Sequence, residues 1–289
     1  MADPKQQGER TVGLLAGSGL FPICFARGAR AHGVRIVAIA IEGEASPELA
    51  AHVDEIHWTG LARLGQWIRI FKQAGVKHAV MCGAVRKAAM YPNPSRLLPD
   101  LRSAKLWYKK LRSREDHTLL GAVAEEFERE GIKLESSVLY CPELLASPGC
   151  LTSRKPTRRE WSDIRFAWPA VKQIAAMQIG QTVVVKDGAV IAVEAMEGTD
   201  EALRRGGKIA RRGAVAVKVA KEGHDERFDI PCIGPDTVDV LVETRISVLA
   251  VEAGKTIVLE KDEVARKANR AKVTIVALTG QDIQRCSEG

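Results

Sequence analysis

The sequence predicts an α/β fold with two domains. Short apolar segments alternate with segments whose apolar side chains recur every three to four residues, and glycine turns separate several of them. The chain has 289 residues, which is enough for one large domain or two of ordinary size. Hydrophobic residues make up 46% of the chain and charged residues 27%. This composition excludes a disordered chain and a polytopic membrane protein.

The first half alternates predicted strands with predicted helices. Buried apolar runs predict strands at 11–16, 34–41, 56–59 and 78–82. Helical spacing predicts helices at 20–30, 61–74, 97–111 and 118–129, the third with an apolar stripe at Leu97, Leu101, Ala104, Tyr108 and Leu111. This alternation predicts a Rossmann-like parallel sheet wound with helices, in a domain covering residues 1–145.

The second half follows a segment, 141–157, that is rich in Pro, Gly, Ser and Thr and marks the domain junction. Asp187-Gly188 between two apolar runs predicts a hairpin. We expect Pro169 to interrupt the helical segment 161–177. Further strands are predicted at 183–186, 190–194, 214–219, 247–251, 256–259 and 273–277, and helices at 198–206, 235–243 and 261–271. The prediction is a mixed α/β domain over residues 146–289.

The formal net charge is +7, and most of it falls in one stretch. The basic residues there are Arg86, Lys87, Arg96, Arg102, Lys105, Lys109, Lys110, Arg112 and Arg114, against Asp100, Glu115 and Asp116. Such a stretch favours an anionic membrane surface, a phosphorylated ligand or a polyanion, and a solvated helix face is the alternative. No early apolar run approaches the ~20 residues that span a bilayer, and no signal peptide is evident, so a cytoplasmic protein is expected.

A glycine turn after the first strand is a candidate phosphate contact. Gly17, Ser18 and Gly19 lead into a helix, where backbone N–H groups and the helix N-terminus favour an anion. Pro22 stands where the dinucleotide fingerprint has its third glycine, which weakens an interpretation as an NAD site. Tight packing of the strand against the helix is the alternative explanation.

A second turn of the same kind follows the strand at 78–82. Gly83 ends this strand, and Arg86 follows three residues later. Ligands of open α/β sheets bind outside the carboxyl ends of the strands, which is where both turns are expected to lie. The sequence therefore predicts Gly83 and Arg86 as substrate contacts.

Three carboxylates, Glu194, Glu197 and Asp200, surround the turn at Gly198 that opens a predicted helix. Capping of this helix by Thr199 or Asp200 is the simplest explanation. Carboxylates at this spacing can also hold a hard cation such as Mg²⁺, which takes few protein oxygens together with substrate phosphates.

A second acidic motif contains Asp225, Arg227 and Asp229. If this segment is extended, the three side chains share one face. Arg227 then either pairs with both carboxylates, or leaves one of them to bind a metal or take a proton from water. In the second case, Lys218 would offset phosphate charge.

These motifs resemble the UDP-2,3-diacylglucosamine pyrophosphatase family of lipid A biosynthesis, the type unrelated to metallophosphoesterases. The resemblance extends over nearly the whole chain and is most specific in the second half. The matching segments are 13–19, 179–185, 192–200, 217–221, 224–231 and 233–234.

The resemblance implies a two-domain α/β protein that hydrolyses the diphosphate of UDP-2,3-diacylglucosamine. Water would attack the phosphorus next to uridine and release UMP and 2,3-diacylglucosamine 1-phosphate (lipid X). The implied cofactor is Mg²⁺, with Mn²⁺ as the alternative. The essential aspartate of the family falls on Asp225, next to His224, where members usually carry Gln. The expected metal ligands are Asp225, Asp200 and Asp229, and the expected substrate contacts are Gly17, Ser18, Gly19, Gly83, Arg86, Gln181, Glu197, Gly198, Thr199 and Lys218.

The implied partners are a lipid-linked UDP-sugar and an anionic membrane, at the inner face of the inner membrane. No nucleic acid is expected, and the formation of a homodimer is left open. Two other classes remain: a nucleotide-binding dehydrogenase or transferase that uses Gly17, Ser18 and Gly19, and a nucleic-acid-binding protein that uses Trp107 and Tyr108. The latter leaves the acidic motifs unexplained.

Overall fold

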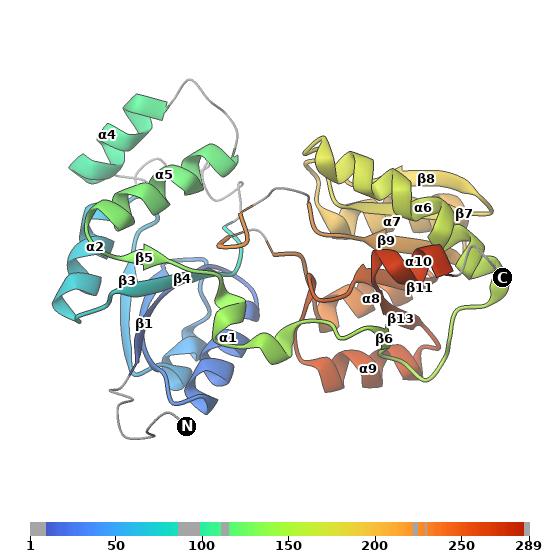
Figure 1. The fold of residues 1–289 in the computed structure, drawn as a ribbon, viewed down its shortest axis with the longest axis horizontal. Helices are drawn as coiled ribbons and strands as arrows, with labels where there is room; N and C mark the ends of the chain where they lie inside the picture. Colours follow the sequence, from blue (N-terminus) through green and yellow to red (C-terminus); the bar gives the residue numbers. More distant parts are fainter. Residues whose placement is uncertain (1–9, 86–98, 111–115, 222–224, 229, 286–289) are drawn as a thin grey trace. The chain divides into compact units, whose positions relative to one another are not determined.

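A computed structural model gives the fold of the chain (Figure 1). The structure describes residues 10–85, 99–110, 116–221, 225–228 and 230–285, without the side chains of 107–110, 116–119 and 285. Two compact units make up the chain. Unit 1 contains Met1–Pro142 and Asp225–Phe228, and unit 2 contains Glu143–His224 and Asp229–Gly289.

Unit 1 is built on a five-stranded parallel sheet in the order β3-β2-β1-β4-β5. The strands are β1 (Thr11–Ala16), β2 (Arg35–Ile41), β3 (Glu55–Thr59), β4 (His78–Cys82) and β5 (Lys133–Leu134). The order reverses between β1 and β4, and the carboxyl ends of strands at such a point are where ligands of open α/β sheets bind. The predicted parallel sheet is confirmed.

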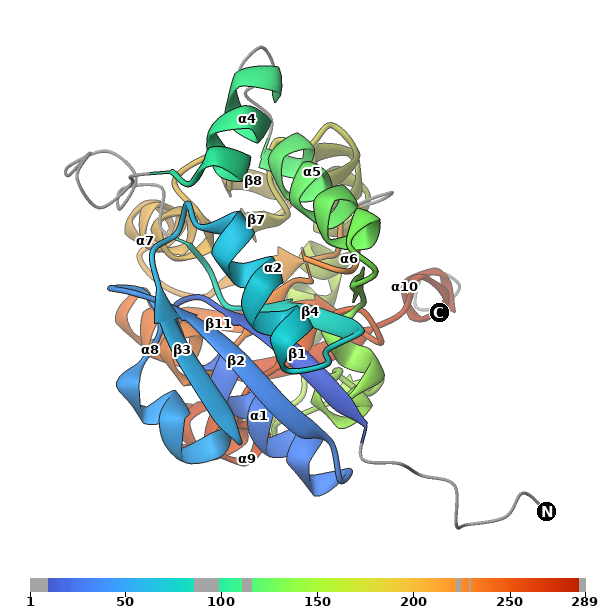
Figure 2. The same cartoon turned by 90° about the vertical axis from the view of Figure 1, so that its left-hand side faces the viewer.

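Helices cover both faces of this sheet, with α2 in front of the strands and α1 behind them in Figure 2. The helical segments are α1 (Phe21–Ala31), η1 (Pro47–His52), α2 (Leu64–Gln73), α4 (Leu101–Lys110), α5 (Asp116–Arg129), η3 (Ser137–Leu139) and η4 (Pro142–Leu144). Phe71 of α2 and Phe127 of α5 pack with ring centroids 5.9 Å apart in the core of unit 1. A Cβ at Gly13 would lie 2.8 Å from the Phe71 ring, so this glycine lets α2 approach the sheet.

The predicted apolar stripe of α4 is wrong where the structure describes it, because Leu101 is 91% exposed and Ala104 is exposed. Polar residues face inward instead. Ser103 Oγ accepts a hydrogen bond from Leu64 N at 3.0 Å, and Asp100 Oδ2 accepts one from Gly65 N at 2.6 Å. The first N–H groups of α2 lack partners within their own helix, and Ser103 of α4 and Asp100, directly before α4, supply acceptors for them. Leu97 and Leu111 lie outside the described residues.

Unit 2 contains a six-stranded mixed sheet in the order β6-β13-β11-β9-β7-β8. Strands β9, β11 and β13 are parallel, whereas β6, β7 and β8 pair antiparallel. The strands are β6 (Gly149–Cys150), β7 (Thr182–Lys186), β8 (Ala189–Val193), β9 (Ala214–Lys218), β11 (Ile246–Glu252) and β13 (Thr274–Leu278); β10 (Cys232–Ile233) and β12 (Ile257–Val258) form a separate pair.

The helices of unit 2 are α6 (Arg158–Ala176), α7 (Thr199–Ala210), α8 (Pro235–Glu243), α9 (Lys261–Arg270) and α10 (Gly280–Arg285). Helix α6 packs on one face of the sheet, and α7, α8 and α9 pack on the other. The predicted α/β class with two domains is confirmed. No helix in the described part of the chain is long and apolar enough to cross a membrane.

Two helices of unit 2 continue past predicted breaks. Helix α6 contains Pro169 without interruption, and Pro169 lies on the exposed side, where water can reach the carbonyl that loses its partner. Helix α7 runs past its predicted end at Gly206. A Cβ at Gly206 would lie 2.8 Å from Val184, and one at Gly207 would lie 2.4 Å from Thr244. These glycines therefore allow close packing inside the helix and do not end it.

Candidate functional site

The two glycine turns of unit 1 lie side by side at the carboxyl ends of β1 and β4. Gly17 N donates to Cys82 O at 2.9 Å, and Ser18 N donates to Ala84 O at 2.7 Å. A Cβ at Gly17 would lie 2.5 Å from Ala84 O, and one at Gly83 would lie 2.5 Å from Ser18 O. The N–H groups of Gly17 and Ser18 are thus used within the fold, and this geometry favours the packing role of both glycines.

Gly19 completes the first turn, with a backbone φ of +89° that favours glycine. It precedes Leu20, the N-cap residue of α1. Its contact with substrate remains a prediction, as do those of Gly17, Ser18 and Gly83. Arg86, predicted to follow the second turn as a phosphate contact, lies outside the described residues.

In unit 2, Lys218 ends β9 and is only 6% exposed. Its Nζ donates to Thr199 Oγ1 at 3.0 Å and to Cys232 O at 3.1 Å, and Thr199 Oγ1 donates to Glu194 Oε1 at 3.0 Å. A lysine ammonium carries three protons, and the third has no hydrogen-bond partner among the described residues. A buried cation beside the N-terminus of α7 is an arrangement that attracts an anion.

Three buried oxygens near Lys218 have no hydrogen-bond partner among the described residues: Gln181 Oε1, Thr182 Oγ1 and Glu194 Oε2. Thr182 lies opposite Lys218 in the sheet, and Glu194 N donates to Thr182 O at 2.9 Å. A Cβ at Gly180 would lie 2.0 Å from Glu194 O, so this glycine allows the close approach. A buried polar group without a partner costs about 1–3 kcal/mol. This corner therefore has capacity for hydrogen bonds from water or a ligand.

Asp200 lies in the first turn of α7, beside Lys218. Removal of water from around its carboxylate raises its pKa, and the positive charge of Lys218 only partly offsets this. Asp236 in the first turn of α8 raises the pKa further by repulsion. The carboxylate accepts no hydrogen bond within the described part of the chain, so a cation bound there would stabilise its ionised form.

Glu197 and Gly198 shape the loop before α7. Glu197 accepts a hydrogen bond from Ala195 N at 3.1 Å and pairs with Arg205, whose Nη2 also donates to Val193 O at 2.7 Å. Gly198 has a φ of +86° at the start of the helix. The side chain of Glu197 thus stabilises the loop, and its predicted contact with substrate remains a prediction.

Asp225 belongs by its contacts to unit 1. The expectation of an extended segment is wrong over 225–228, where Phe228 N donates to Asp225 O at 3.1 Å and closes a turn. Asp225 Oδ1 accepts from Arg227 N at 3.1 Å, as aspartates commonly do in turns. The Nε of Arg227 lies 2.8 Å from Oδ1 and 2.9 Å from Oδ2. His224 and Asp229 lie outside the described residues.

Arg227 has a second partner that no sequence motif indicates. Its Nη1 lies 3.0 Å from Glu128 Oε1 on α5. Asp225 and, more weakly, Glu128 raise the pKa of the Arg227 guanidinium. Nothing in the pattern around Glu128 indicates this contact, because 99 residues separate the partners.

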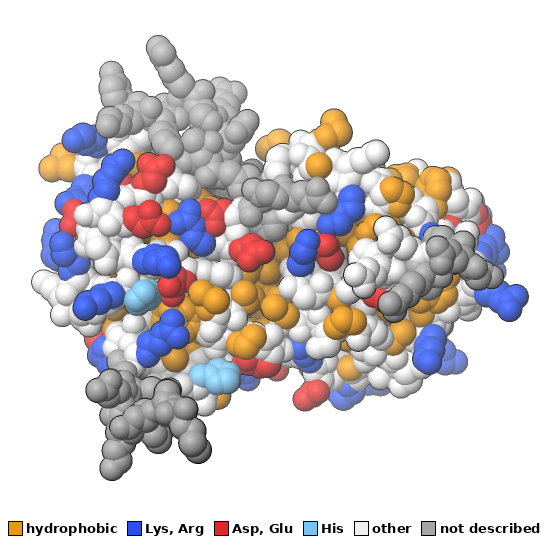
Figure 3. Space-filling view, viewed as in Figure 1, with side chains coloured by type: hydrophobic (Ala, Val, Ile, Leu, Met, Phe, Trp, Pro, Cys, Tyr) orange, Lys and Arg blue, Asp and Glu red, His pale blue; other side chains and the backbone are white. Residues whose placement is uncertain are grey.

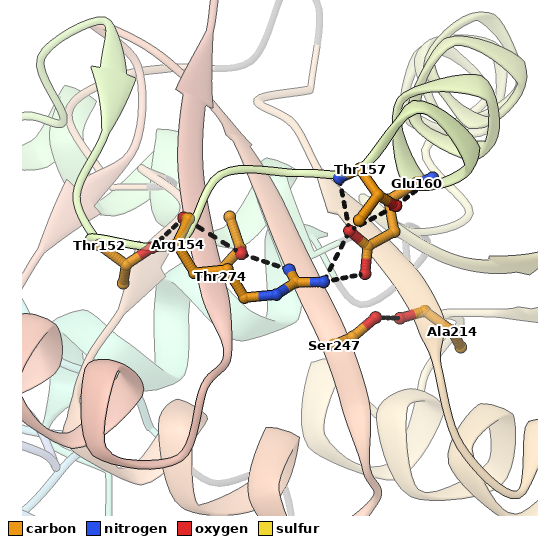
Figure 4. Close-up of polar contacts among 7 residues, drawn as sticks. All are labelled: Thr152, Arg154, Thr157, Glu160, Ala214, Ser247 and Thr274. Carbon is orange, nitrogen blue, oxygen red and sulfur yellow. Dashed lines mark hydrogen bonds and ion pairs between the residues drawn. The ribbon is translucent and has the colours of Figure 1, made fainter.

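Another polar network lies near the amino-terminal ends of the parallel strands of unit 2 (Figure 4). Arg154 Nη2 contacts both carboxylate oxygens of Glu160 at 2.7 and 2.8 Å, and Thr157 N donates to Glu160 at 2.7 Å. Arg154 also donates to Thr274 at the start of β13. All these groups satisfy one another and cap α6, so the network stabilises the fold and offers no reactive group.

The predicted metal ligands fall in both units: Asp225 lies in unit 1, Asp200 lies in unit 2, and Asp229 is outside the described residues. No group of three His, Cys, Asp or Glu side chains able to hold a metal occurs within the described ranges. Mg²⁺ usually takes one or two carboxylates together with substrate phosphates. The carboxylate of Asp200 is exposed and accepts no hydrogen bond from a described residue, so it is free to share a cation with substrate phosphates.

Comparison with known proteins gives a relative that matches nearly the whole chain. UDP-2,3-diacylglucosamine pyrophosphatase LpxI of Caulobacter vibrioides is 28% identical over 283 residues, which cover 94% of this chain and 99% of that protein. Among solved structures, a multifunctional pyruvate carboxylase from Rhizobium etli matches 53% of this chain and 15% of its own. Its 14% identity and TM-score of 0.28 are too low to indicate a shared fold.

Two family models match adjoining parts of the chain. The LpxI N-terminal domain matches residues 11–144, and the LpxI C-terminal domain matches residues 147–276. Together they leave only two residues between them and reach nearly from one end of the chain to the other. The chain therefore belongs to the LpxI family.

Proposed function

We propose that this chain hydrolyses the diphosphate bond of UDP-2,3-diacylglucosamine, giving UMP and 2,3-diacylglucosamine 1-phosphate in lipid A synthesis. The proposal draws its substrate from the name of the relative, a UDP-2,3-diacylglucosamine pyrophosphatase. The observation that carries it is the buried Lys218 side chain at the end of β9, beside the start of α7, whose third ammonium proton has no partner in the described part of the chain. A diphosphate has the charge and the acceptor oxygens that this group needs.

In this account, the phosphate oxygens bind at Lys218 and at the N-terminal N–H groups of α7, which start at Thr199. Glu194 orients the Thr199 hydroxyl, so that its lone pairs face Lys218. These donors neutralise the charge of the bound diphosphate and hold it in place as water attacks. The P–O bond to the sugar phosphate breaks, and the leaving phosphate carries the electron pair of that bond.

Asp225 is the proposed catalytic carboxylate, which accepts the proton of the attacking water. Arg227 orients this carboxylate by contacting both of its oxygens. General-base assistance of this kind contributes roughly 10²–10⁴-fold in rate.

The proposed cofactor is Mg²⁺, or Mn²⁺ as the alternative, with Asp200, Asp225 and Asp229 as its ligands. When bound, the ion neutralises phosphate charge and polarises the phosphoryl group. Asp200→Asn should then raise the Mg²⁺ concentration needed for half-maximal activity, because the variant lacks one anionic ligand. An unchanged Mg²⁺ requirement in this variant would exclude Asp200 as a ligand.

The proposed partners include an anionic membrane surface at the inner face of the inner membrane. On the face shown in Figure 3, Lys and Arg side chains of unit 1 are interspersed with Asp and Glu. Arg102 itself pairs with Glu130. The proposal therefore depends on Lys105, Lys109 and Lys110 of α4, together with the exposed Leu101.

The dehydrogenase or transferase alternative loses support, because the N–H groups of Gly17 and Ser18 are already hydrogen-bonded within the fold.

The direct test of the proposed hydrolysis is incubation of the purified chain with UDP-2,3-diacylglucosamine and Mg²⁺, with chromatographic detection of UMP. We expect UMP release that stops in excess chelator and returns with added Mg²⁺. Intact substrate after prolonged incubation with Mg²⁺ contradicts the proposed function, and full turnover in excess chelator contradicts the role of the metal.

A further inference from the structure

We propose that Glu128 on α5 is a positioning residue for Asp225 and acts through Arg227. Asp225 is placed late in the sequence, yet its turn belongs to unit 1, together with α5. The inference rests on the proposed catalytic role of Asp225 and adds a residue to it that no sequence motif contains.

The contacts form a chain of three side chains. Arg227 directs its Nε and Nη2 at Asp225 and its Nη1 at Glu128, with Nη1 3.0 Å from Glu128 Oε1. The guanidinium is planar and rigid, so fixing one edge fixes the direction of the other. Glu128 therefore determines where Arg227 holds the carboxylate of Asp225.

The backbone of the same turn is fixed to unit 1 by another residue. Phe228 is half-buried and packs against the core cluster that contains Phe71 and Phe127. The Cζ of Arg227 lies 5.3 Å from the centroid of the Phe228 ring, within the range of a cation–π contact. Phe228 thus anchors the turn, and Glu128 sets the orientation of the side chains on it.

The exposure of these groups separates positioning from stability. The side chains of Arg227 and Glu128 are 30% and 49% exposed. Ion pairs with this exposure contribute little to the stability of a fold. Loss of Glu128 should therefore leave unit 1 folded, whereas displacement of a reacting group by ~1 Å can cost up to about 10²-fold in rate.

The test compares Glu128→Gln with Glu125→Gln. Glu125 lies on the same helix, and its one ion pair with a described residue is the longer contact with Arg129, at 3.7 Å. Glu128→Gln should lower kcat by about 10-fold and leave KM within about twofold, because the substrate contacts lie elsewhere. Glu125→Gln should match wild type in both constants, and the melting temperatures of the two variants should agree.

A double variant tests whether Glu128 acts through Arg227. If it does, Glu128→Gln combined with Arg227→Gln should be no slower than Arg227→Gln alone, because the connection is already broken. Independent, multiplying losses would overturn the proposed connection, and so would a Glu128→Gln enzyme with wild-type kcat.

Hydrogen exchange gives a readout that does not depend on turnover. Amide exchange of residues 225–228, measured without substrate, should be faster in Glu128→Gln than in wild type and unchanged in Glu125→Gln. If wild type releases no UMP, the proposed function fails, and the exchange comparison still decides whether Glu128 holds the turn. Equal exchange in all three proteins would overturn this part of the inference.

Discussion

The Nζ of Lys218 donates to the Oγ1 of Thr199 at 3.0 Å, and this bond joins the end of β9 to the first residue of α7. Thr199 Oγ1 in turn donates a hydrogen bond to Glu194 Oε1, so the three side chains have one consistent direction of donation. Lys218 is only 6% exposed. Its third ammonium proton has no partner among the described residues, which makes this corner of unit 2 the strongest candidate for binding a phosphate oxygen.

Lys218→Met should weaken substrate binding more than it slows the chemical step. The variant keeps much of the side-chain length but loses the charge. A hydrogen bond from a charged group to the substrate, which the variant cannot form, contributes about 1.5–3 kcal/mol. We expect KM to rise roughly 10- to 100-fold. Lys208→Met on the exposed side of α7 is the matched control and should retain the wild-type KM. Equal KM values for both variants would place the phosphate elsewhere.

Asp225→Ala should lose nearly all turnover while the chain still folds and binds substrate. The expected loss is at least the roughly 10²–10⁴-fold effect of general-base assistance. Asp229→Ala should be milder if Asp229 only orients Arg227. Steady-state UMP release from both variants, with thermal melting as the folding control, gives the comparison. A well-folded Asp225→Ala protein within tenfold of the wild-type rate would show that the chemistry belongs to another residue.

The network in Figure 4 should contribute stability that depends on pH. Burial raises the pKa of Glu160, but the hydrogen bonds that it accepts, among them those from Arg154 and Thr157, together lower it by more than burial raises it. The pKa of Glu160 therefore lies below its ordinary value. The ionised form is thus favoured by folding. This stability is present above the unfolded pKa of about 4.3 and is lost as the pH falls through the folded pKa.

Glu160→Gln should lower the free energy of unfolding at pH 7 by about 2 kcal/mol, because Arg154 loses its anionic partner. Below pH 4 the difference in the free energy of unfolding between Glu160→Gln and wild type should shrink. Glu263→Gln, which breaks the exposed pair with Arg266, should have little effect at either pH. Denaturant unfolding at pH 7 and pH 3.5 measures these differences. A constant gap between Glu160→Gln and wild type at both values would mean that ionisation of Glu160 contributes nothing.

Helix α4 should contribute to membrane binding. Reversal of Lys105, Lys109 and Lys110 to Glu should weaken binding to vesicles that contain phosphatidylglycerol, since each cation near such a surface is worth about 1 kcal/mol. Sedimentation with vesicles at low and high salt measures the loss.

The matched control for α4 is reversal of Lys208, Arg211 and Arg212, three exposed cations of unit 2. This control changes the net charge by the same amount, so it should retain most of the vesicle binding. Equal losses of vesicle binding in both triple variants would show that only the total charge matters. If neither variant loses vesicle binding, the basic residues of α4 are a solvated helix face without a role in membrane binding.

The sequence predicts regular elements well where packing follows a simple period. The strand at His78–Cys82 and the helix at Pro235–Glu243 match their predicted bounds. Prediction fails where a distant partner decides. Gly206 reads as a helix end, yet contact with Val184 requires a glycine inside α7. Leu101 fits an apolar stripe, yet α4 turns its polar side toward the N-terminus of α2.

In the candidate site, too, local contacts follow from the sequence and distant ones do not. The sequence groups the residues around Gly198 and Thr199, and the structure joins Thr199 to Lys218 and Glu194, because β8, β9 and α7 are neighbours in unit 2. The turn at Asp225 could not be predicted, because its conformation depends on α5 and the core of unit 1. Alternation of charged and apolar residues predicts an extended strand, and the contact of Arg227 with Glu128 has no counterpart in any local pattern.

The proposed reaction begins with attack of water on the phosphorus next to uridine in UDP-2,3-diacylglucosamine. Hydrolysis in water enriched in ¹⁸O, followed by mass spectrometry of both products, shows which phosphorus is attacked. We expect UMP to gain one ¹⁸O atom and 2,3-diacylglucosamine 1-phosphate to gain none. Label in the lipid product, with unlabelled UMP, would show that water attacks the other phosphorus.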